Sequence, residues 1–366
     1  MKKIYYITAV FATLFLVGCG DGIDLPGVNV ETDLNKIPLP DNNVNLEQVE
    51  LKPSTEPMLH EGLHTEEDFQ RIRDKKAAGE EPWVSAYQLL VESQFSQKTA
   101  DTYPTEWIKR GVSGDENYMN AARGATIAYQ QALRWKIEQD DEYAAKAVEN
   151  LNKWVQTCVG VTGNTNLSLA AGLYGYEFAI AGELLRDYGG WDRADFAAFQ
   201  NWLLKVFYPA NDDFLKRHHD TNALHYWANW CLCNIAAKMA IGIVTDRRDI
   251  YNEGIAHLQT GDTNGRLRRA IYHDYAPDYN FAQWQESGRD QGHTLMCVGL
   301  MGVICQLAWS QGDDFFAYDD NLFLRACEYA ACCNYTNETV PYTTYIWQKQ
   351  SQWGYPIPEE QTTLGG

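Results

Sequence analysis

The feature that most constrains this chain is a series of ten segments in which apolar residues recur about every 3.6 positions, the period of an α-helix. Polar turns that contain Gly or Asp separate several of them, and the alternating pattern of strands is scarce. We therefore expect an all-α protein of antiparallel helix hairpins, arranged as a bundle, a solenoid or a closed (α/α) toroid. The segments are residues 65–79, 82–94, 118–138, 142–158, 169–188, 193–208, 222–244, 248–259, 292–309 and 321–333.

The aromatic content favours the toroid among these three arrangements. The chain has 12 Trp and 22 Tyr. Aromatic rings stack on the apolar faces of pyranose sugars, and their indole and hydroxyl groups bond the sugar hydroxyls. A solenoid should show a fixed repeat period, and the sequence has none beyond a loose rhythm of helix hairpins. We expect a cleft that handles sugars, although packing between helices explains most of the individual rings equally well.

The N-terminus predicts export and lipid anchoring. Lys2 and Lys3 precede a short apolar run, so residues 1–18 are interpreted as a signal peptide. Leu16–Cys19 resembles a bacterial lipobox, which implies lipidation of Cys19 and anchoring to the cell envelope, on the periplasmic or surface face of the outer membrane. An ordinary signal peptide with a chance Cys is the alternative. Residues 19–58 are expected to be a flexible tether, and residues 59–366 the folded domain.

The net charge of −19 argues against nucleic acid as a partner, because phosphate binding needs a basic surface. An acidic polysaccharide would have to be attracted by a local cationic patch. Six of the eight histidines lie between Arg217 and His293, together with several arginines, and they supply such a patch. The residues of this patch are His218, His219, His225, His257, His273 and His293, with Arg266, Arg268, Arg269 and Arg289. The sequence does not indicate the oligomeric state.

The nine cysteines include Cys19 and form no CxxC pair. Most of the others lie in apolar helical segments, which predicts buried thiols outside any disulfide or zinc site; Cys332 and Cys333 are ambiguous. A zinc site formed by His218, His219 and His225 is disfavoured, because adjacent histidines point apart on a helix and no HExxH motif is present.

Two stretches concentrate groups that can do chemistry. The first, QESGRDQGHT at 285–294, would place Arg289 and His293 on one helical face together with Gln285 or Glu286. The second, NALHYWANW at 222–230, would present Asn222, His225 and Asn229 on one side of a helix that begins at Asn222.

With residues 60–83, 117–154 and 172–188, these two stretches resemble the alginate-lyase-like superfamily in the same order along the chain. The resemblance is greatest to the Bacteroides-type lipoproteins of polysaccharide lyase family 38, and more distant to family 5, over about residues 59–340. It implies an (α/α) toroid and β-elimination on a 1,4-linked polyuronate such as polymannuronate, alginate or glucuronan.

Elimination removes the proton on C5 of a uronate, which requires neutralisation of its carboxylate, a base at C5 and an acid at the leaving O4. It demands no metal or organic cofactor. We expect Asn222 and the bidentate guanidinium of Arg289 at the carboxylate, with Glu286 and Asp290 holding Arg289. His225 would be the base or a further neutralising group, and His293 an acid or a base.

The chain departs from the family 5 pattern in two places. Family 5 has an adjacent Asn-His pair, whereas Ala223 and Leu224 separate Asn222 from His225. It also has a Tyr soon after the Arg, whereas none follows Arg289 before Tyr318. The hydroxyl acid would then be Tyr174, Tyr176 or Tyr279, with His293 as substitute. The resemblance also implies closing helices after Cys333, where this sequence is irregular, so an incomplete toroid is expected. The expected substrate-binding residues are Tyr174, Tyr176, Gln285, Glu286, Trp227 and His219.

Two other functions are compatible with the sequence. A glycoside hydrolase on a similar toroid would use two carboxylates, Glu286 or Asp290 with Asp220 or Glu177. A non-catalytic surface lipoprotein that captures glycans fits the lipobox and the aromatic content as well. The sequence does not decide among mannuronate, guluronate and glucuronate.

Overall fold

The computed structural model describes residues 31–32, 54–336, 339–350 and 356–366. The described chain forms two compact units. Unit 1 comprises residues 55–212 and 236–253, and unit 2 comprises residues 213–235 and 254–366. That residues 59–366 make one domain stays a prediction, and Cys19, the signal peptide and most of the tether lie outside the described residues.

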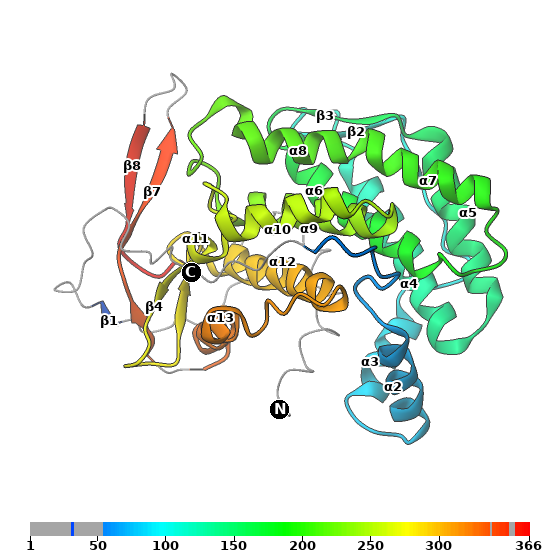
Figure 1. The fold of residues 1–366 in the computed structure, drawn as a ribbon, viewed down its shortest axis with the longest axis horizontal. Coiled ribbons are helices and arrows are strands. Elements are labelled where there is room, and N and C mark those ends of the chain that lie inside the picture. The colour runs from blue at the N-terminus through cyan, green and yellow to red at the C-terminus, as the bar shows by residue number, and fades with distance from the viewer. Residues whose placement is uncertain (1–30, 33–53, 337–338, 351–355) are drawn as a thin grey trace. The chain divides into compact units, whose positions relative to one another are not determined.

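Unit 1 is built from helix hairpins. α4 packs against α5 and α6, and α2 and α3 pack against α4. Figure 1 shows α2 and α3 as a short hairpin, drawn in blue. A parallel pair of short strands, β2 and β3, joins residues 107–110 to residues 160–163. The elements are α2 (Glu66–Ala77), α3 (Trp83–Glu92), β2 (Trp107–Arg110), α4 (Tyr118–Glu138), α5 (Asp141–Thr157), β3 (Gly160–Gly163), α6 (Leu167–Leu184) and α7 (Arg193–Val206).

Local signals explain where these helices begin and how closely they pack. Thr65 and Asp68 form a capping box at the start of α2. The side chain of Asp140 accepts a hydrogen bond from the backbone N–H of Glu142 and caps α5. α4 and α5 meet at Gly124, where an added Cβ would lie 2.2 Å from the indole nitrogen of Trp154, so only glycine allows this approach.

The chain passes between the units within α8 (Tyr208–Arg217), α9 (Ala228–Val244) and α10 (Arg248–Thr260). In unit 2, α12 packs against α13, and α13 packs on the antiparallel pair β4–β5. β7 and β8 form a second antiparallel hairpin, drawn in red in Figure 1, in which Tyr345 pairs with Gln361. The remaining elements are β1 (Glu31–Thr32), η3 (His218–Asp220), α11 (Leu267–Ala270), β4 (Ile271–Asp274), β5 (Ala282–Trp284), α12 (Gln291–Ser310), α13 (Tyr318–Tyr335), β6 (Pro341–Tyr342), β7 (Tyr345–Gln350) and β8 (Pro356–Gln361).

Each of the ten predicted segments contains a helix, but three local predictions are wrong. Residues 222–227 form turns, and α9 begins only at Ala228. Residues 285–290 also form a turn, so Arg289 lies before the first residue of α12. The C-terminal region predicted as irregular forms β6, β7 and β8. Both displaced starts lie beside the polar groups described below, which satisfy the first backbone N–H groups of α9 and α12.

The helix α12 and most of the cysteines lie within the protein. α12 is long and apolar enough to cross a bilayer, but most of it is buried within the protein, as in the core helix of a globular domain. None of the described cysteines forms a disulfide. The thiols in apolar helical segments are buried as predicted except that of Cys327, which is partly exposed, and the ambiguous Cys332 and Cys333 are buried.

Candidate active site

Two segments of unit 2 that carry the predicted chemistry are both attached to the strand β7. One is the loop at residues 221–227, which precedes α9, and the other is the turn at residues 285–290, which precedes α12. Trp347 on β7 stacks on the ring of Trp227 with centroids 4.5 Å apart, and the hydroxyl of Tyr345 bonds the turn. The loop, the turn and β7 all belong to unit 2.

Asn222 fixes the loop to β7. Its backbone N–H donates to the side-chain oxygen of Gln350 at 2.6 Å, and its Nδ2 donates to the carbonyl of Gln348 at 3.2 Å. Its Oδ1 accepts from the backbone N–H of Leu224 at 3.0 Å, which closes a local turn. Both ends of the amide are thus engaged within the protein, and a substrate carboxylate, which can only accept, would have to replace a bond that Nδ2 donates.

His225 is held in one tautomer. Its Nδ1 accepts a hydrogen bond from the backbone N–H of Gln350 at 2.9 Å. An amide N–H can only donate, so Nδ1 carries the lone pair and the proton of the neutral ring lies on Nε2. Burial, with a smaller contribution from the charge of Lys349, lowers the pKa of His225 and favours this neutral form. The ring therefore offers an N–H donor at Nε2, which suits a neutralising group and does not suit a base.

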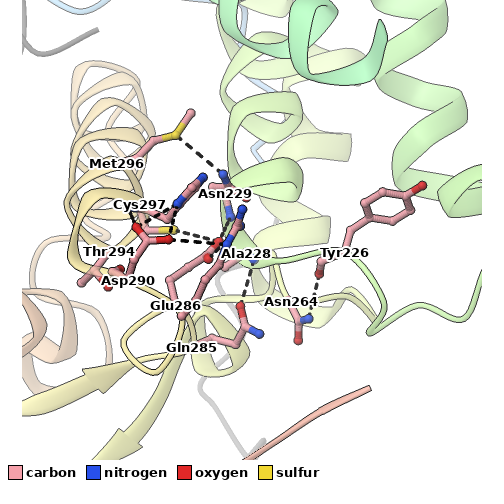
Figure 2. A network of polar contacts seen from close by, with 12 residues as sticks. Tyr226, Ala228, Asn229, Asn264, Gln285, Glu286, Asp290, Thr294, Met296 and Cys297 are labelled. Atoms are coloured by element: carbon pink, nitrogen blue, oxygen red, sulfur yellow. Dashed lines mark hydrogen bonds and ion pairs between the residues drawn. The ribbon is translucent and has the colours of Figure 1, made fainter. Parts of the chain in front are cut away.

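The turn at 285–290 caps the helix that follows the loop. The side-chain oxygen of Gln285 accepts from the backbone N–H of Ala228 at 3.0 Å, and Oε1 of Glu286 accepts from that of Asn229 at 3.1 Å. Figure 2 shows both side chains reaching the first turn of α9. A carboxylate is stabilised at a helix N-terminus by these N–H groups and by the helix dipole. Gln285 is 4 % exposed and Glu286 is 0 % exposed, so their predicted direct contact with substrate is not available in this conformation.

Arg289 is the partly exposed cation of the turn at 285–290. Its guanidinium lies 3.3 Å from Oε2 of Glu286 and 5.3 Å from the centroid of the Trp227 ring. Burial raises the pKa of Glu286, while Arg289 and His293 oppose that increase. A cation on an aromatic face with a buried carboxylate behind it is fixed in place, and 28 % of its side chain remains exposed. Both predicted contacts are present, since Oδ2 of Asp290 also lies 3.7 Å from Nε of Arg289.

His293 and Asp290 form a pair at the start of α12. The carboxylate of Asp290 caps the helix by accepting from the backbone N–H of His293 at 2.7 Å. Its second oxygen lies 2.7 Å from Nδ1 of the same imidazole. Burial would raise the pKa of Asp290, but the hydrogen bonds from the ring and backbone of His293 outweigh it and hold the pKa below its usual value. Since an ionised carboxylate accepts, Nδ1 of the neutral ring carries the proton and Nε2 carries the lone pair.

The other predicted residues lie elsewhere or have other contacts. Tyr174 and Tyr176 belong to α6 in unit 1 and are 5 % and 3 % exposed. Tyr279 is 52 % exposed and packs edge-on against Tyr275. The ring of His219 contacts Phe214 and Tyr226.

The zinc alternative is not supported by the part of the chain that the structure describes. Within those residues, no group of three or more His, Cys, Asp or Glu side chains is placed to hold a metal ion. His218 is buried in the short helix η3, and its pKa is lowered to about 4 by burial and by the neighbouring His219.

Sequence reasoning missed the contribution of β7. The indole N–H of Trp347 donates to the carbonyl of His225 at 2.7 Å, and the backbone of Gln350 sets the tautomer of that histidine. Asn264, also missed, donates to the carbonyls of Leu224 and Tyr226. The only signal was the richness of the C-terminal region in Trp and Tyr, since a backbone donor leaves no mark in the sequence.

A family model matches most of the chain. The model described as alginate lyase matches residues 72–338. This range includes the loop at 221–227 and the turn at 285–290, and it ends before β7. No curated protein sequence matches the chain.

Several solved structures share the fold at low sequence identity. A variant of alginate lyase A1-III in complex with a tetrasaccharide matches with a TM-score of 0.56 at 14% identity, covering 77% of this chain and 82% of that one. Alginate lyase A1-III from Sphingomonas species A1 matches with a TM-score of 0.51 at 13% identity, covering 75% and 78%. An alginate lyase from Bacteroides ovatus matches with a TM-score of 0.51 at 14% identity, covering 73% and 82%. The predicted fold class, an (α/α) toroid, is confirmed.

Proposed function

The chain belongs to the alginate lyase family, and from this premise we propose that it cleaves a 1,4-linked polyuronate by β-elimination, leaving a 4,5-unsaturated uronate at the new end. Family membership makes the chain a polysaccharide lyase; the polymer and the roles of the side chains are our proposal. We propose polymannuronate or glucuronan as the polymer, for the stereochemical reason given below.

The observation that carries the proposal is the guanidinium of Arg289, fixed against Trp227 and Glu286 with part of its surface exposed. A uronate carboxylate can take both N–H groups of one edge of a guanidinium. When the C5 proton leaves, negative charge spreads onto this carboxylate, so a fixed cation there lowers the barrier. The Nε2–H of His225 is a second hydrogen-bond donor that can stabilise this negative charge.

His293 is the base in this scheme. Its Nε2 carries the lone pair, and the negative charge of Asp290 stabilises the imidazolium that forms when Nε2 takes the C5 proton. The electrons of the C5–H bond form the C4–C5 double bond as the bond from C4 to the leaving oxygen breaks. The imidazolium then returns its proton to that oxygen, so protons and electrons balance.

One imidazole can serve as both base and acid only if the C5 proton and the leaving O4 lie on the same face of the sugar. They do so in 1,4-linked β-D-mannuronate and in glucuronate, and they lie on opposite faces in α-L-guluronate. The scheme therefore favours polymannuronate and glucuronan over polyguluronate. In this scheme His293 also takes the role of the tyrosine acid that is expected from family 5.

The contacts of the candidate carboxylates favour a lyase over a hydrolase. Two carboxyl groups would have to reach the scissile bond. Glu286 is 0 % exposed, and Asp290 is engaged by the ring and backbone of His293. Asp220 pairs with Arg217 at the surface, and Glu177 belongs to α6 in unit 1.

The test is the ultraviolet absorbance of the conjugated double bond when the purified protein is mixed separately with polymannuronate, glucuronan and polyguluronate. We expect absorbance to rise with the first two and little with the third. Replacement of Arg289 by Ala should reduce turnover on the order of a hundredfold or more. A saturated product, or binding without turnover in a folded protein, would favour the hydrolase or the glycan-capture function.

We also propose that the enzyme is anchored to the cell envelope by lipidation of Cys19, as the lipobox predicts. The support is the sequence alone, since Cys19 lies outside the described residues. Cell fractionation of a Cys19→Ser variant tests it: release from the membrane fraction is expected, and retention there would contradict the anchor.

A further inference from the structure

Tyr345, the first residue of β7, is bonded to both ends of the turn that presents Arg289. It is 2 % exposed. Its hydroxyl donates to the carbonyl of Gln285 and accepts from the backbone N–H of Gly288 at 3.1 Å. The carbonyl of Gln285 is buried and the amide of Gly288 is half-buried, and a buried polar group that loses its partner is costly.

The turn leaves little room for movement at this point. A Cβ built on Gly288 would lie 2.5 Å from the hydroxyl of Tyr342 and 3.1 Å from that of Tyr345, so this close approach requires glycine. The backbone N–H of Arg289 donates to the carbonyl of Glu286 at 2.9 Å across the same turn. The position of the Arg289 backbone is thus fixed from the side of β7.

A second contact fixes the turn from the C-terminal region. The backbone N–H of Gly365 donates to the carbonyl of Ser287 at 2.8 Å. A Cβ added at Gly365 would lie 2.5 Å from the carbonyl carbon of Arg289. Among the described residues, however, Tyr345 is the one whose side chain bonds both Gln285 and Gly288.

We infer that Tyr345 is a positioning residue for Arg289: its hydroxyl holds the turn so that the guanidinium lies on Trp227, where it meets the substrate carboxylate. Its burial prevents it from being the acid or base. The catalytic part of this inference rests on the proposed elimination. The structural part, the placement of the guanidinium against Trp227, does not.

The first experiment measures turnover of Tyr345→Phe, which keeps the ring and removes only the hydroxyl. A small displacement of a neutralising group costs a large part of its effect, so we expect kcat to fall on the order of tenfold to a hundredfold. KM should change less, because Arg289 acts mainly on charge that develops in the transition state. The matched control is Tyr329→Phe, since Tyr329 is also buried and donates one hydrogen bond, to the carbonyl of Pro341 at 3.0 Å.

The same substitution in an Arg289→Lys background separates positioning from general destabilisation. If Tyr345 acts through the guanidinium, Tyr345→Phe should cause a much smaller loss there than in the wild-type background. An equal loss in the two backgrounds, or an equal loss in Tyr329→Phe, would overturn the inference.

A second readout does not depend on any substrate. In protein labelled with nitrogen-15 arginine, the Nε–H signal of Arg289 is identified by its absence from Arg289→Ala, and the ring of Trp227 should shift it. We expect Tyr345→Phe to move this signal towards the value of a solvated arginine and Tyr329→Phe to leave it unchanged. An unchanged signal in Tyr345→Phe would overturn the inference. A moved signal in a protein inactive on every polyuronate would reject the proposed function alone.

If Tyr345→Phe does not fold, Gly365→Ala tests the same turn with Tyr345 intact. Its added methyl group must displace the backbone at Arg289. The inference predicts the same selective loss of kcat and the same movement of the Nε–H signal, and wild-type values for both would contradict it.

Discussion

His225 and His293 are the same side chain in two settings, and their surroundings give them opposite capacities. A backbone N–H donates to Nδ1 of His225, whereas the carboxylate of Asp290 accepts from Nδ1 of His293. The first ring therefore presents a proton at Nε2 and the second presents a lone pair there. The comparison teaches that the partner of one ring nitrogen decides whether a histidine in this site can donate or accept.

Replacement of His293 by Ala should have the largest effect. If this ring is the base, its loss should reduce kcat by about a thousandfold, in the middle of the range for a general base. The melting temperature should change little, because Asp290 still caps α12. The measurement is the rate of double-bond formation on the best polyuronate. A loss of less than about tenfold would assign the base to another residue.

Asp290→Asn should be the next largest change, on the order of a few hundredfold in kcat. Asparagine is a good N-cap, so α12 should keep its start. It has no negative charge to stabilise the imidazolium, and it no longer selects the tautomer with the proton on Nδ1. Rate and melting temperature should be measured together. Equal activity of Asn and Asp at this position would show that the pair is structural.

His225 should tolerate a substitution that preserves a donor. We expect His225→Ala to lose on the order of a hundredfold in turnover, as for a removed electrostatic donor. His225→Gln should remain within about tenfold of the wild type, because its amide can donate where Nε2–H does. His293→Gln should reduce turnover as much as His293→Ala does. The assigned roles are contradicted if Gln restores turnover at both positions, or at neither.

Trp347→Phe should have a smaller effect of several-fold. It keeps an aromatic ring against Trp227 and removes the indole N–H that donates to the carbonyl of His225. A net hydrogen bond is worth about 1 kcal/mol, which is about a fivefold change in an equilibrium. The loss should appear in both stability and turnover. Trp309→Phe, at a ring that is 54 % exposed in α12, is the control and should change neither.

The smallest expected effect is on the pH dependence of stability. Burial lowers the folded-state pKa of His225 below its usual value of 6.5. The neutral ring is therefore favoured by folding, and its contribution to stability is complete above about pH 6.5 and lost as the pH falls below that value. The charged group that faces it is Lys349. Melting temperatures between pH 7 and pH 5 should fall less for His225→Gln than for the wild type; an equal fall would contradict the assignment.

The sequence predicted much of the fold because helical periodicity survives in each long segment. It failed at residues 222–227, where the apolar period continues through a turn, and at residues 285–290, where polar and charged residues at helical spacing form a turn. In both places polar side chains cap the helix that follows. Glu286 and Arg289 were found as partners because opposite charges three residues apart can meet in a turn as well as in a helix.

The chemical roles of the two histidines could not be predicted from the sequence. The residue that fixes His225 acts through its backbone at position 350, where any residue except proline could donate. β7 also lies beyond the range matched by the family model, so resemblance gave no indication of it. In the sequence, nothing distinguishes Tyr345 from the many other aromatic residues.

The contact between Gln350 and His225 spans 125 positions of the chain. Closing so long a loop is slow compared with forming helices, whose contacts are local. Helix formation and catalytic competence should therefore be separate events in time. During refolding, the circular dichroism of the helices should recover first and enzymatic turnover later, when β7 docks and His225 acquires its partner on that strand.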